Sequence, residues 1–345
     1  MVTIKDIAKH TNVSPTTVSN VIHGRLEKVS PETRIKVERA LHELNYTSNM
    51  AGRLLANHGS KIIGVIIQDS DALNERYYEN PYHGELIQAL EGHIREAGYF
   101  MMFHRVPNVE EGVKLVNMWN IEGVIISGAT NSDVADWQCS IDAPMVFLDT
   151  YENDQTCAKL NVGVNDYQGS FDMVSYLAEN QHHTIIFVAK GTTPDEWRGV
   201  DAMRAKGAAD AAEKFGLDFI PIAVPSTYRN YQQTVDQLIA KIKGQDVTFF
   251  FASDLLAVQA LSEFFKHAVQ VPRDVSVVSF DGTPYASYAT PALTTVYQDV
   301  NLKAIHAINL LIKTIRQEPC EEQHIQINPV IIKGQSIKID NGFKK

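Results

Sequence analysis

Alternation between short apolar runs and amphipathic stretches dominates the chain from Lys61 onward. It predicts parallel β-sheets with helices on both faces, because parallel strands are joined by helical crossovers. The expected strands are KIIGVII, YFMMF, GVIIS and MVFLD in a first series, and VGV, TIIFVA, FIPIAV, TFFFAS and VSVVSF in a second. The expected helices cover residues 84–97, 109–119, 166–180, 198–215, 230–243 and 254–267. Two such α/β sheets side by side enclose a cleft at the carboxyl ends of their strands, where ligands bind.

Charge is distributed unevenly along the 345 residues. The net charge of −10 argues against a nucleic-acid binder when the chain is taken as a whole. Residues 1–61, however, carry nine Lys and Arg against five Asp and Glu, so the acidic excess belongs to the remainder. A small basic head on an acidic body is expected where only the head contacts phosphate.

The head, residues 1–47, has the pattern of three short helices. The first lies in TIKDIAKH and is followed by the turn TNV, where Asn12 tolerates a left-handed conformation. The second begins with Ser14 as N-cap and Pro15 at the first helical position, and the third begins at SPETR. Two helices joined by a tight turn within a three-helix core are typical of a helix-turn-helix domain.

The exposed face of the second helix carries short polar side chains, although Lys and Glu are better helix formers. Side chains that enter a major groove must let the backbone approach and still read base edges. We therefore predict base contacts from Pro15, Thr16 and Asn20, and phosphate contacts from Ser14, Thr17 and Ser19. The alternative is a plain three-helix bundle with a Thr-rich solvated face.

The segments TIKDIAKHTNVSPTTVSNVIHG and VSPETRIKVERALHELNY resemble the DNA-binding head of the lactose-repressor (LacI/GalR) family of bacterial transcription regulators. In that family, the residues that match Pro15, Thr16 and Asn20 select the operator sequence. The family usually has Arg where this chain has Asn20. Because Arg favours guanine and Asn favours adenine, the preferred operator is expected to differ at that base pair.

Residues 48–60 are the expected hinge, and NMAGRLLAN within them predicts a weak short helix. The resemblance implies a helix that orders on DNA, pairs with its twin and inserts Leu55 into the minor groove, with Asn49 and Gly52 in the same segment. Ser48 replaces the usual Pro and Gly52 the usual Ala, and Gly lowers helix propensity by about 1 kcal/mol. The hinge is therefore expected to depend strongly on DNA and partner. A linker with a stray apolar pair is the alternative.

The resemblance covers the whole chain and implies a bilobed body like that of periplasmic sugar-binding proteins. PALTTVYQD, residues 291–299, matches the family motif Pro-x-Leu-Thr-Thr-Val-x-Gln. This fold implies that the chain crosses between lobes near residues 160, 290 and 320. The expected domains are the helix-turn-helix head at 1–47, the hinge at 48–60 and an effector-binding and dimerisation body at 61–345, with lobe 1 at 61–160 and 291–320 and lobe 2 at 161–290 and 321–345.

Polar residues at the ends of the expected strands are candidates for effector binding. Asp149 ends MVFLD, Ser253 follows TFFFA and Asp281 ends VSVVSFD. Arg204 matches the family's Arg-x-x-Gly, whose arginine reaches the effector. Carboxylates and an arginine around a cleft suit hydrogen bonds to hydroxyls, so a sugar or sugar derivative is expected. Weaker candidates are Gln68, Asp69, Tyr82 and Trp197. Each has a structural alternative, such as helix capping by a strand-end carboxylate or surface packing of an aromatic ring.

These features predict a repressor that binds a near-palindromic operator as a homodimer and responds to a small molecule, with release of DNA by a sugar-type inducer favoured. A purine or nucleoside co-repressor is the alternative. A solute-binding protein shares the cleft but has no use for a basic head. An enzyme is not expected, because the chain has no phosphate loop, no Gly-x-Ser-x-Gly elbow and no His-Glu-x-x-His.

Neither a cofactor nor a metal is expected, because Cys139, Cys157 and Cys320 lie far apart without ligand spacing. The chain has no apolar run of 18 residues, so no membrane span is expected. The charged start MVTIKDIAKH lacks the apolar core of a signal peptide, so a cytoplasmic protein with free thiols is expected.

Overall fold

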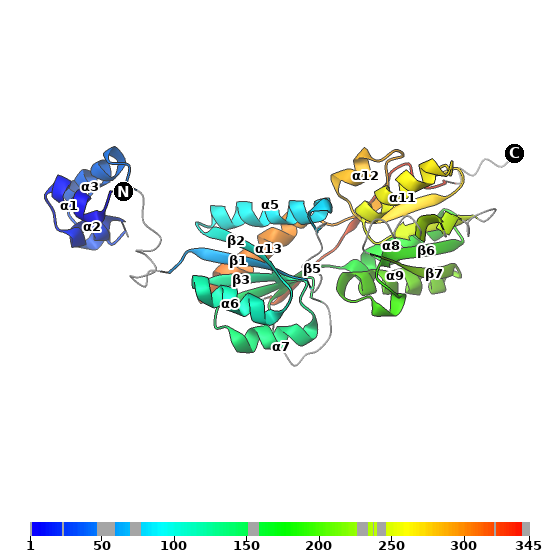
Figure 1. Ribbon diagram of the computed structural model, residues 1–345, viewed down its shortest axis with the longest axis horizontal. Coiled ribbons are helices and arrows are strands. Elements are labelled where there is room, and N and C mark those ends of the chain that lie inside the picture. The colour runs from blue at the N-terminus through cyan, green and yellow to red at the C-terminus, as the bar shows by residue number, and fades with distance from the viewer. Residues whose placement is uncertain are drawn as a thin grey trace. The chain divides into compact units, whose positions relative to one another are not determined.

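The computed structural model describes the residues of the chain in several ranges: 2–22, 24–46, 59–69, 77–150, 159–225, 234–236, 238–239, 246–320 and 322–339. The chain divides into two compact units, Met1–Ser60 and Lys61–Lys345, each of which is described by itself (Figure 1). The predicted hinge residues Asn49, Gly52 and Leu55, and most of the expected helix 230–243, lie outside the described ranges.

The first unit contains α1 (Ile4–Thr11), α2 (Pro15–Ile22), the 3₁₀ turn η1 (Leu26–Lys28) and α3 (Pro31–Glu43). Thr3 and Asp6 form a capping box at the start of α1, and Asn12 ends it in the left-handed conformation with φ of 51°. One small core joins the three helices; its buried members are Ile7, Ala8, Val18, Val21, Val37 and Ala40. The three predicted helices are therefore confirmed.

The second unit has two six-stranded sheets in two lobes (Figure 1). The first sheet has the order β11-β5-β4-β3-β1-β2 and is parallel throughout. Its strands are β1 (Ile62–Gln68), β2 (Phe100–Val106), β3 (Gly123–Ser127), β4 (Met145–Leu148), β5 (Asn161–Val164) and β11 (His324–Ile327). Helices α5 (Pro81–Glu96), preceded by η2 (Tyr77–Glu79), and α13 (Val300–Ile315) pack on one face. Helices α6 (Val109–Trp119) and α7 (Asn131–Ser140) pack on the other.

The second sheet has the order β12-β10-β9-β8-β6-β7, in which only β12 is antiparallel to its neighbour. Its strands are β6 (Thr184–Lys190), β7 (Asp218–Val224), β8 (Val247–Phe251), β9 (Ser276–Asp281), β10 (Thr294–Tyr297) and β12 (Val330–Ile332). Helices α8 (Asp166–Glu179) and α9 (Gly199–Phe215), with η3 (Pro194–Glu196) before α9, pack on one face. Helix α11 (Asp254–Lys266) packs on the other, and α12 (Pro284–Tyr288) follows β9.

The chain crosses between the lobes later in the sequence than predicted, by one short strand at each of the three crossings. β5 and β11 belong to the first sheet, although residues 161–164 and 324–327 were assigned to lobe 2. β10 belongs to the second sheet, although residues 294–297 were assigned to lobe 1. Strands of three or four residues carry no signal for the sheet that they join, because their pairing partners are distant in sequence.

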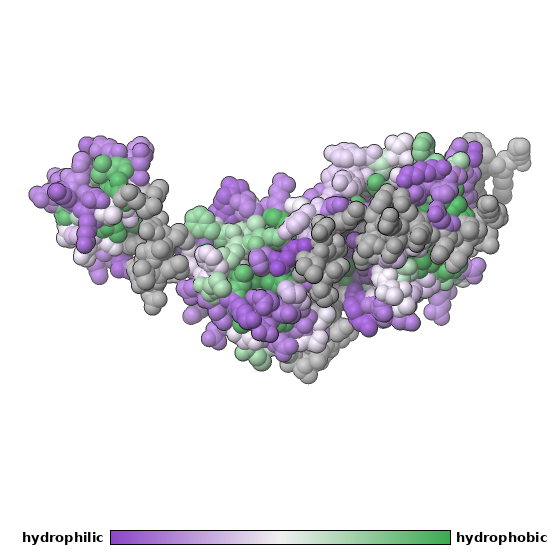
Figure 2. All heavy atoms as spheres, viewed as in Figure 1, coloured by the Kyte–Doolittle hydropathy of each residue, from purple (hydrophilic) through white to green (hydrophobic). Residues whose placement is uncertain are grey.

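The surface is mostly polar. Figure 2 shows hydrophilic side chains interspersed with smaller hydrophobic areas over the visible face of both units. No helix in the described ranges has the length and apolar character needed to span a bilayer.

Candidate functional site

Helix α2 is fixed at its start by Ser14. The Ser14 Oγ accepts a hydrogen bond from the Thr17 backbone N–H at 3.0 Å, and the two hydroxyls lie 2.8 Å apart. This N-cap satisfies one of the backbone donors that a helix start leaves free. Val18 and Val21 are buried against the core, so the opposite face of α2 is turned outward.

The predicted DNA-contacting residues lie along this outward face. Pro15 and Thr16 are exposed and Asn20 is half-buried. Of the predicted phosphate contacts, Ser14 is exposed, while Thr17 and Ser19 are half-buried. No charged side chain lies on α2 between Pro15 and Ile22, so this surface presents hydroxyl, amide and methyl groups. Such groups read base edges rather than attract phosphate at long range.

A cavity of about 410 Å³ lies between the two lobes of the second unit. Five predicted effector residues line it: Tyr82, Asp149, Arg204, Ser253 and Asp281. They come from α5, the ends of β4, β8 and β9, and helix α9. The five side chains therefore lie at one cavity between the lobes, where the sequence analysis expected them.

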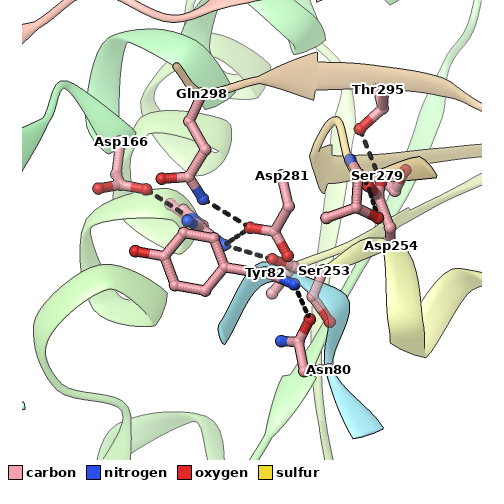
Figure 3. Close-up of polar contacts among 12 residues, drawn as sticks. Asn80, Tyr82, Asp166, Ser253, Asp254, Ser279, Asp281, Thr295 and Gln298 are labelled. Atoms are coloured by element: carbon pink, nitrogen blue, oxygen red, sulfur yellow. Dashed lines mark hydrogen bonds and ion pairs between the residues drawn. The ribbon is translucent and has the colours of Figure 1, made fainter. Parts of the chain in front are cut away.

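The second-lobe wall is built around Arg204, which is almost fully buried. Its Nε donates to Asp166 Oδ1 at 2.6 Å, and its Nη1 donates to the Ala252 carbonyl at 2.6 Å and to Asp281 Oδ1 at 3.2 Å. Figure 3 labels the acceptors Asp166 and Asp281. Its guanidinium carbon lies 3.7 Å from the centre of the Phe280 ring. Burial alone would lower the pKa of Arg204, but the neighbouring carboxylates outweigh it and raise that pKa, so the guanidinium stays charged.

Asp281 is also buried, with its backbone at a φ of 108°. The Gln298 amide donates to its Oδ1 at 2.8 Å, beside the bond from Arg204. Burial raises the pKa of Asp281 to about 7, although the Arg204 charge opposes the shift. This carboxyl therefore titrates close to neutral pH.

Lys303 is fully buried and extends this hydrogen-bond network to the first lobe, where it lies on α13. Its ammonium donates to Asp149 Oδ2 at 2.6 Å, to the Tyr82 hydroxyl at 3.1 Å and to Gln298 Oε1 at 3.1 Å. Burial lowers and Asp149 raises the pKa of Lys303, and the net shift is upward. Since Gln298 contacts both Lys303 and Asp281, one continuous set of hydrogen bonds joins the walls of the two lobes.

Three weaker candidates are directed elsewhere. Gln68 accepts a hydrogen bond from the indole of Trp137 at 2.8 Å, within the first-lobe interior. Asp69 is paired with Arg105 at 2.8 Å. Trp197 is buried with its ring edge against Phe187, 5.4 Å between centroids. None of the three predicted residues lines the cavity, because each is held by a partner that has no recognisable signal in the sequence.

Ser253 and its neighbour Asp254 have different surroundings. The Ser253 hydroxyl accepts from Leu256 N at 3.4 Å as the N-cap of α11, and the residue also lines the cavity. The Asp254 carboxylate is fully buried and accepts from Ser279, Thr295 and Thr283. Asp254 therefore ties α11 to β9 and β10 and has a structural role.

Several polar residues of the site were missed by sequence reasoning, namely Asp166, Asp201, Gln298 and Lys303. Asp166 and Asp201 lie in the first turns of helices, where acidic residues are common without any further role. Lys303 lies within an otherwise apolar helix face, between Val300 and Ala304. A lysine on the buried stripe of an amphipathic helix is unusual, and that signal marks it in the sequence.

A larger groove of about 930 Å³ runs between α5 and the region of α12. It contains none of the predicted effector residues. In the described ranges, no three His, Cys, Asp or Glu side chains come together as a metal site.

Comparison with known proteins finds a family match in each of the two units. Residues 3–49 match the lacI family of bacterial regulatory proteins, and residues 174–337 match the periplasmic binding protein-like domain. The HTH-type transcriptional repressor PurR of Escherichia coli O139:H28 is 30% identical over 356 residues, covering 98% of this chain and 97% of that protein. The chain belongs to the lacI family. The PurR repressor of Histophilus somni strain 2336 is 28% identical over 350 residues, covering 98% and 99%.

Solved structures of other transcription regulators share the fold. The lac repressor dimer bound to operator and the anti-inducer ONPF has a TM-score of 0.82 at 22% identity, covering 97% of this chain and 98% of that one. The CelR–cellobiose complex has a TM-score of 0.70 at 21% identity, covering 97% and 100%. Repressors of this family bind operator DNA as dimers together with a small-molecule effector. The chain is therefore a lacI-family transcriptional repressor with a ligand-binding body.

Proposed function

We propose that this repressor binds a near-palindromic operator as a homodimer through Pro15, Thr16 and Asn20, and that a sugar or sugar derivative in the interlobe cavity lowers its affinity for that operator. The observation that carries the effector proposal is the polar wall of the cavity, where Asp149, Arg204 and Asp281 meet. Paired carboxylate and guanidinium groups suit the hydroxyls of a carbohydrate.

Coupling between effector and operator is thermodynamic. Gln298, bonded to Asp281 of one lobe wall and Lys303 of the other, belongs to a network that an effector in the cavity would reorganise. An effector that favours one lobe arrangement changes operator affinity only if the two arrangements differ in how they hold the paired hinges. The acidic body and basic head support the same division of roles, in which the body senses and the head binds.

A purine-type effector is the second candidate, because the relatives named PurR include the 30% identical repressor of Escherichia coli. In that case, the ligand would act as a co-repressor and strengthen operator binding. Hypoxanthine and guanine therefore belong in any ligand screen beside mono- and disaccharides.

The test is a fluorescence-anisotropy titration of promoter-region DNA at low ionic strength, with and without each ligand that raises the melting temperature. Asp281→Ala is expected to bind DNA as the wild type does and to lose the response to the ligand. A ligand response retained by Asp281→Ala removes Asp281 from the site. No binding to promoter DNA under any condition overturns the proposed function itself.

A further inference from the structure

Asp201 is a carboxylate of the cavity wall that has no donor in the protein. It lies in the first turn of α9, half-buried, and lines the cavity with its neighbours Gly199 and Val200. None of the described residues donates a hydrogen bond to its side chain or forms an ion pair with it. Arg204, one turn further along, directs its Nε and Nη1 to Asp166, Ala252 and Asp281 instead.

The surroundings of Asp201 disfavour its negative charge. Burial raises the pKa of Asp201, and the Asp166 charge adds to this shift. Arg204 and Lys190 oppose the shift without cancelling it. A carboxylate that is partly shielded from water without a compensating hydrogen bond lowers the stability of the folded chain. A helix start also attracts acids, but Asp201 forms no capping bond, so capping does not account for it.

Asp201 shares the cavity lining with two further carboxylates. Asp281 lines the same cavity from the end of β9 and Asp149 from the end of β4, while Arg198 and Lys190 are exposed at its second-lobe side. Asp149 is already bonded to Lys303, and Asp281 to Arg204 and Gln298. Among these three acids, Asp201 is thus the one whose carboxylate has no donor among the described residues. It can therefore accept hydrogen bonds from a ligand in the cavity.

We propose that Asp201 is a specificity-determining residue, which accepts a hydrogen bond from a hydroxyl or amine of the effector and rejects effectors that place a negative charge beside it. The ligand class is a neutral or amino sugar rather than a sugar phosphate or a sugar acid. This proposal rests on the proposed function, because it requires the interlobe cavity to be the effector site.

The first experiment needs no ligand and measures melting temperature by differential scanning fluorimetry on the full chain. Asp201→Asn is expected to raise the melting temperature by about 1–2 °C, because it removes a charge that lacks a donor. A structural acid would give the opposite sign, since its loss removes a favourable interaction with the helix dipole. Asp218→Asn, the same substitution at an exposed acid at the start of β7, is the matched control and should change nothing. Asp166→Asn, which removes a bonded acid, should lower the melting temperature.

The second experiment compares ligands that share one sugar ring. Glucose, glucosamine, glucose 6-phosphate and glucuronate, with the matching galactose series and hypoxanthine, are titrated against wild type and Asp201→Asn. The wild type is expected to bind a neutral or amino sugar more tightly than its anionic counterpart. Asp201→Asn should bind that sugar about 10- to 100-fold more weakly, the loss of one charge-assisted hydrogen bond, and should discriminate less against the anionic one. A loss confined to the amino sugar identifies an amine donor, and an equal loss for both sugars identifies a hydroxyl.

The proposal is overturned by a lower melting temperature for Asp201→Asn, by tightest wild-type binding of a phosphate, an acid or hypoxanthine, or by no binding of any sugar in the panel. An unchanged sugar affinity in Asp201→Asn does so as well. Operator binding separates this failure from that of the proposed function. If Asp201→Asn and wild type bind promoter DNA equally and Asp281→Ala loses the ligand response, the cavity is the effector site whatever the role of Asp201.

Discussion

At the scale of single residues, the charge state of Asp281 makes stability depend on pH. Its pKa is raised by burial to about 7, far above the ordinary value of 3.8. The folded chain therefore holds a proton that the unfolded chain releases, and this stabilisation is complete below about pH 4 and lost as pH rises through 7. Asp281→Asn keeps an oxygen for Arg204 and Gln298 but cannot titrate. Relative to this variant, the wild-type melting temperature should fall between pH 5 and pH 8.

The comparison is made between variants at each pH, so that the titration of other groups cancels. Circular dichroism melts at pH 5, 6, 7 and 8 give the difference in melting temperature between wild type and Asp281→Asn. A difference that stays constant over this range would show that Asp281 is ionised throughout, held by Arg204 against the effect of burial.

Base preference is the second property of a single residue. Asn20→Arg is expected to shift the preference at one operator base pair toward guanine, because the guanidinium bonds to guanine O6 and N7, whereas the Asn amide suits adenine. Binding-site selection from a randomised duplex library measures the change. His42→Arg on the exposed side of α3 is the control for added positive charge. The same selected sequence for wild type and Asn20→Arg would remove Asn20 from base recognition.

At this scale, sequence reasoning placed some strand-end residues at the cavity but not all of them. Asp149 and Asp281 could be placed at the cleft because parallel strands end at one edge of a sheet. Gln68 and Asp69 also follow a strand, but Trp137 and Arg105 hold them, and these partners lie 69 and 36 residues away in the chain. Lys303 and Asp201 depend on tertiary packing, which no local pattern encodes.

At the scale of elements, the glycine of the Arg-x-x-Gly motif has a packing role. A Cβ added to Gly207 would lie 2.1 Å from the Tyr167 carbonyl oxygen of α8, where helices α8 and α9 cross. Gly207→Ala must therefore push the two helices apart and is expected to destabilise the body by about 1–3 kcal/mol or more. Gly92→Ala on α5 meets nothing within 4 Å and should stabilise by about 0.5–1 kcal/mol. Urea unfolding of both variants checks the pair, and an equal effect of the two would contradict this account.

Helices and strands with strong periodicity were well predicted, whereas weak ones were not. Helix α6 was expected over 109–119 and occupies those residues. Helix α7 was missed, because NSDVADWQCS buries only Val134 and Trp137 and presents no continuous apolar stripe. The short strands β5, β10 and β11 were placed in the wrong lobes because three crossovers assemble each sheet from distant segments. Element type follows from local pattern, but sheet membership follows from the whole chain.

At the scale of the whole molecule, we expect the segment between the two units to link effector binding to DNA binding. Leu55 is expected to enter the minor groove from the hinge, and Leu55→Ala should reduce operator affinity about tenfold or more and reduce bending, because the wedge that unstacks a base step is lost. Effector affinity in the absence of DNA should not change, since the cavity is built by the second unit alone.

Effector binding and operator binding must affect each other equally, because the two equilibria are thermodynamically linked. If the effector lowers operator affinity by some factor, operator DNA must lower effector affinity by the same factor, and a variant that weakens the hinge contribution should reduce both factors together. Effector titrations with and without operator duplex, on wild type and Leu55→Ala, measure the coupling, and circular-permutation gel shifts measure the bend. Leu54→Ala removes the same apolar area one position earlier and serves as the control. Equal affinity and equal bending for Leu55→Ala and wild type would exclude the wedge and require another route between cavity and operator.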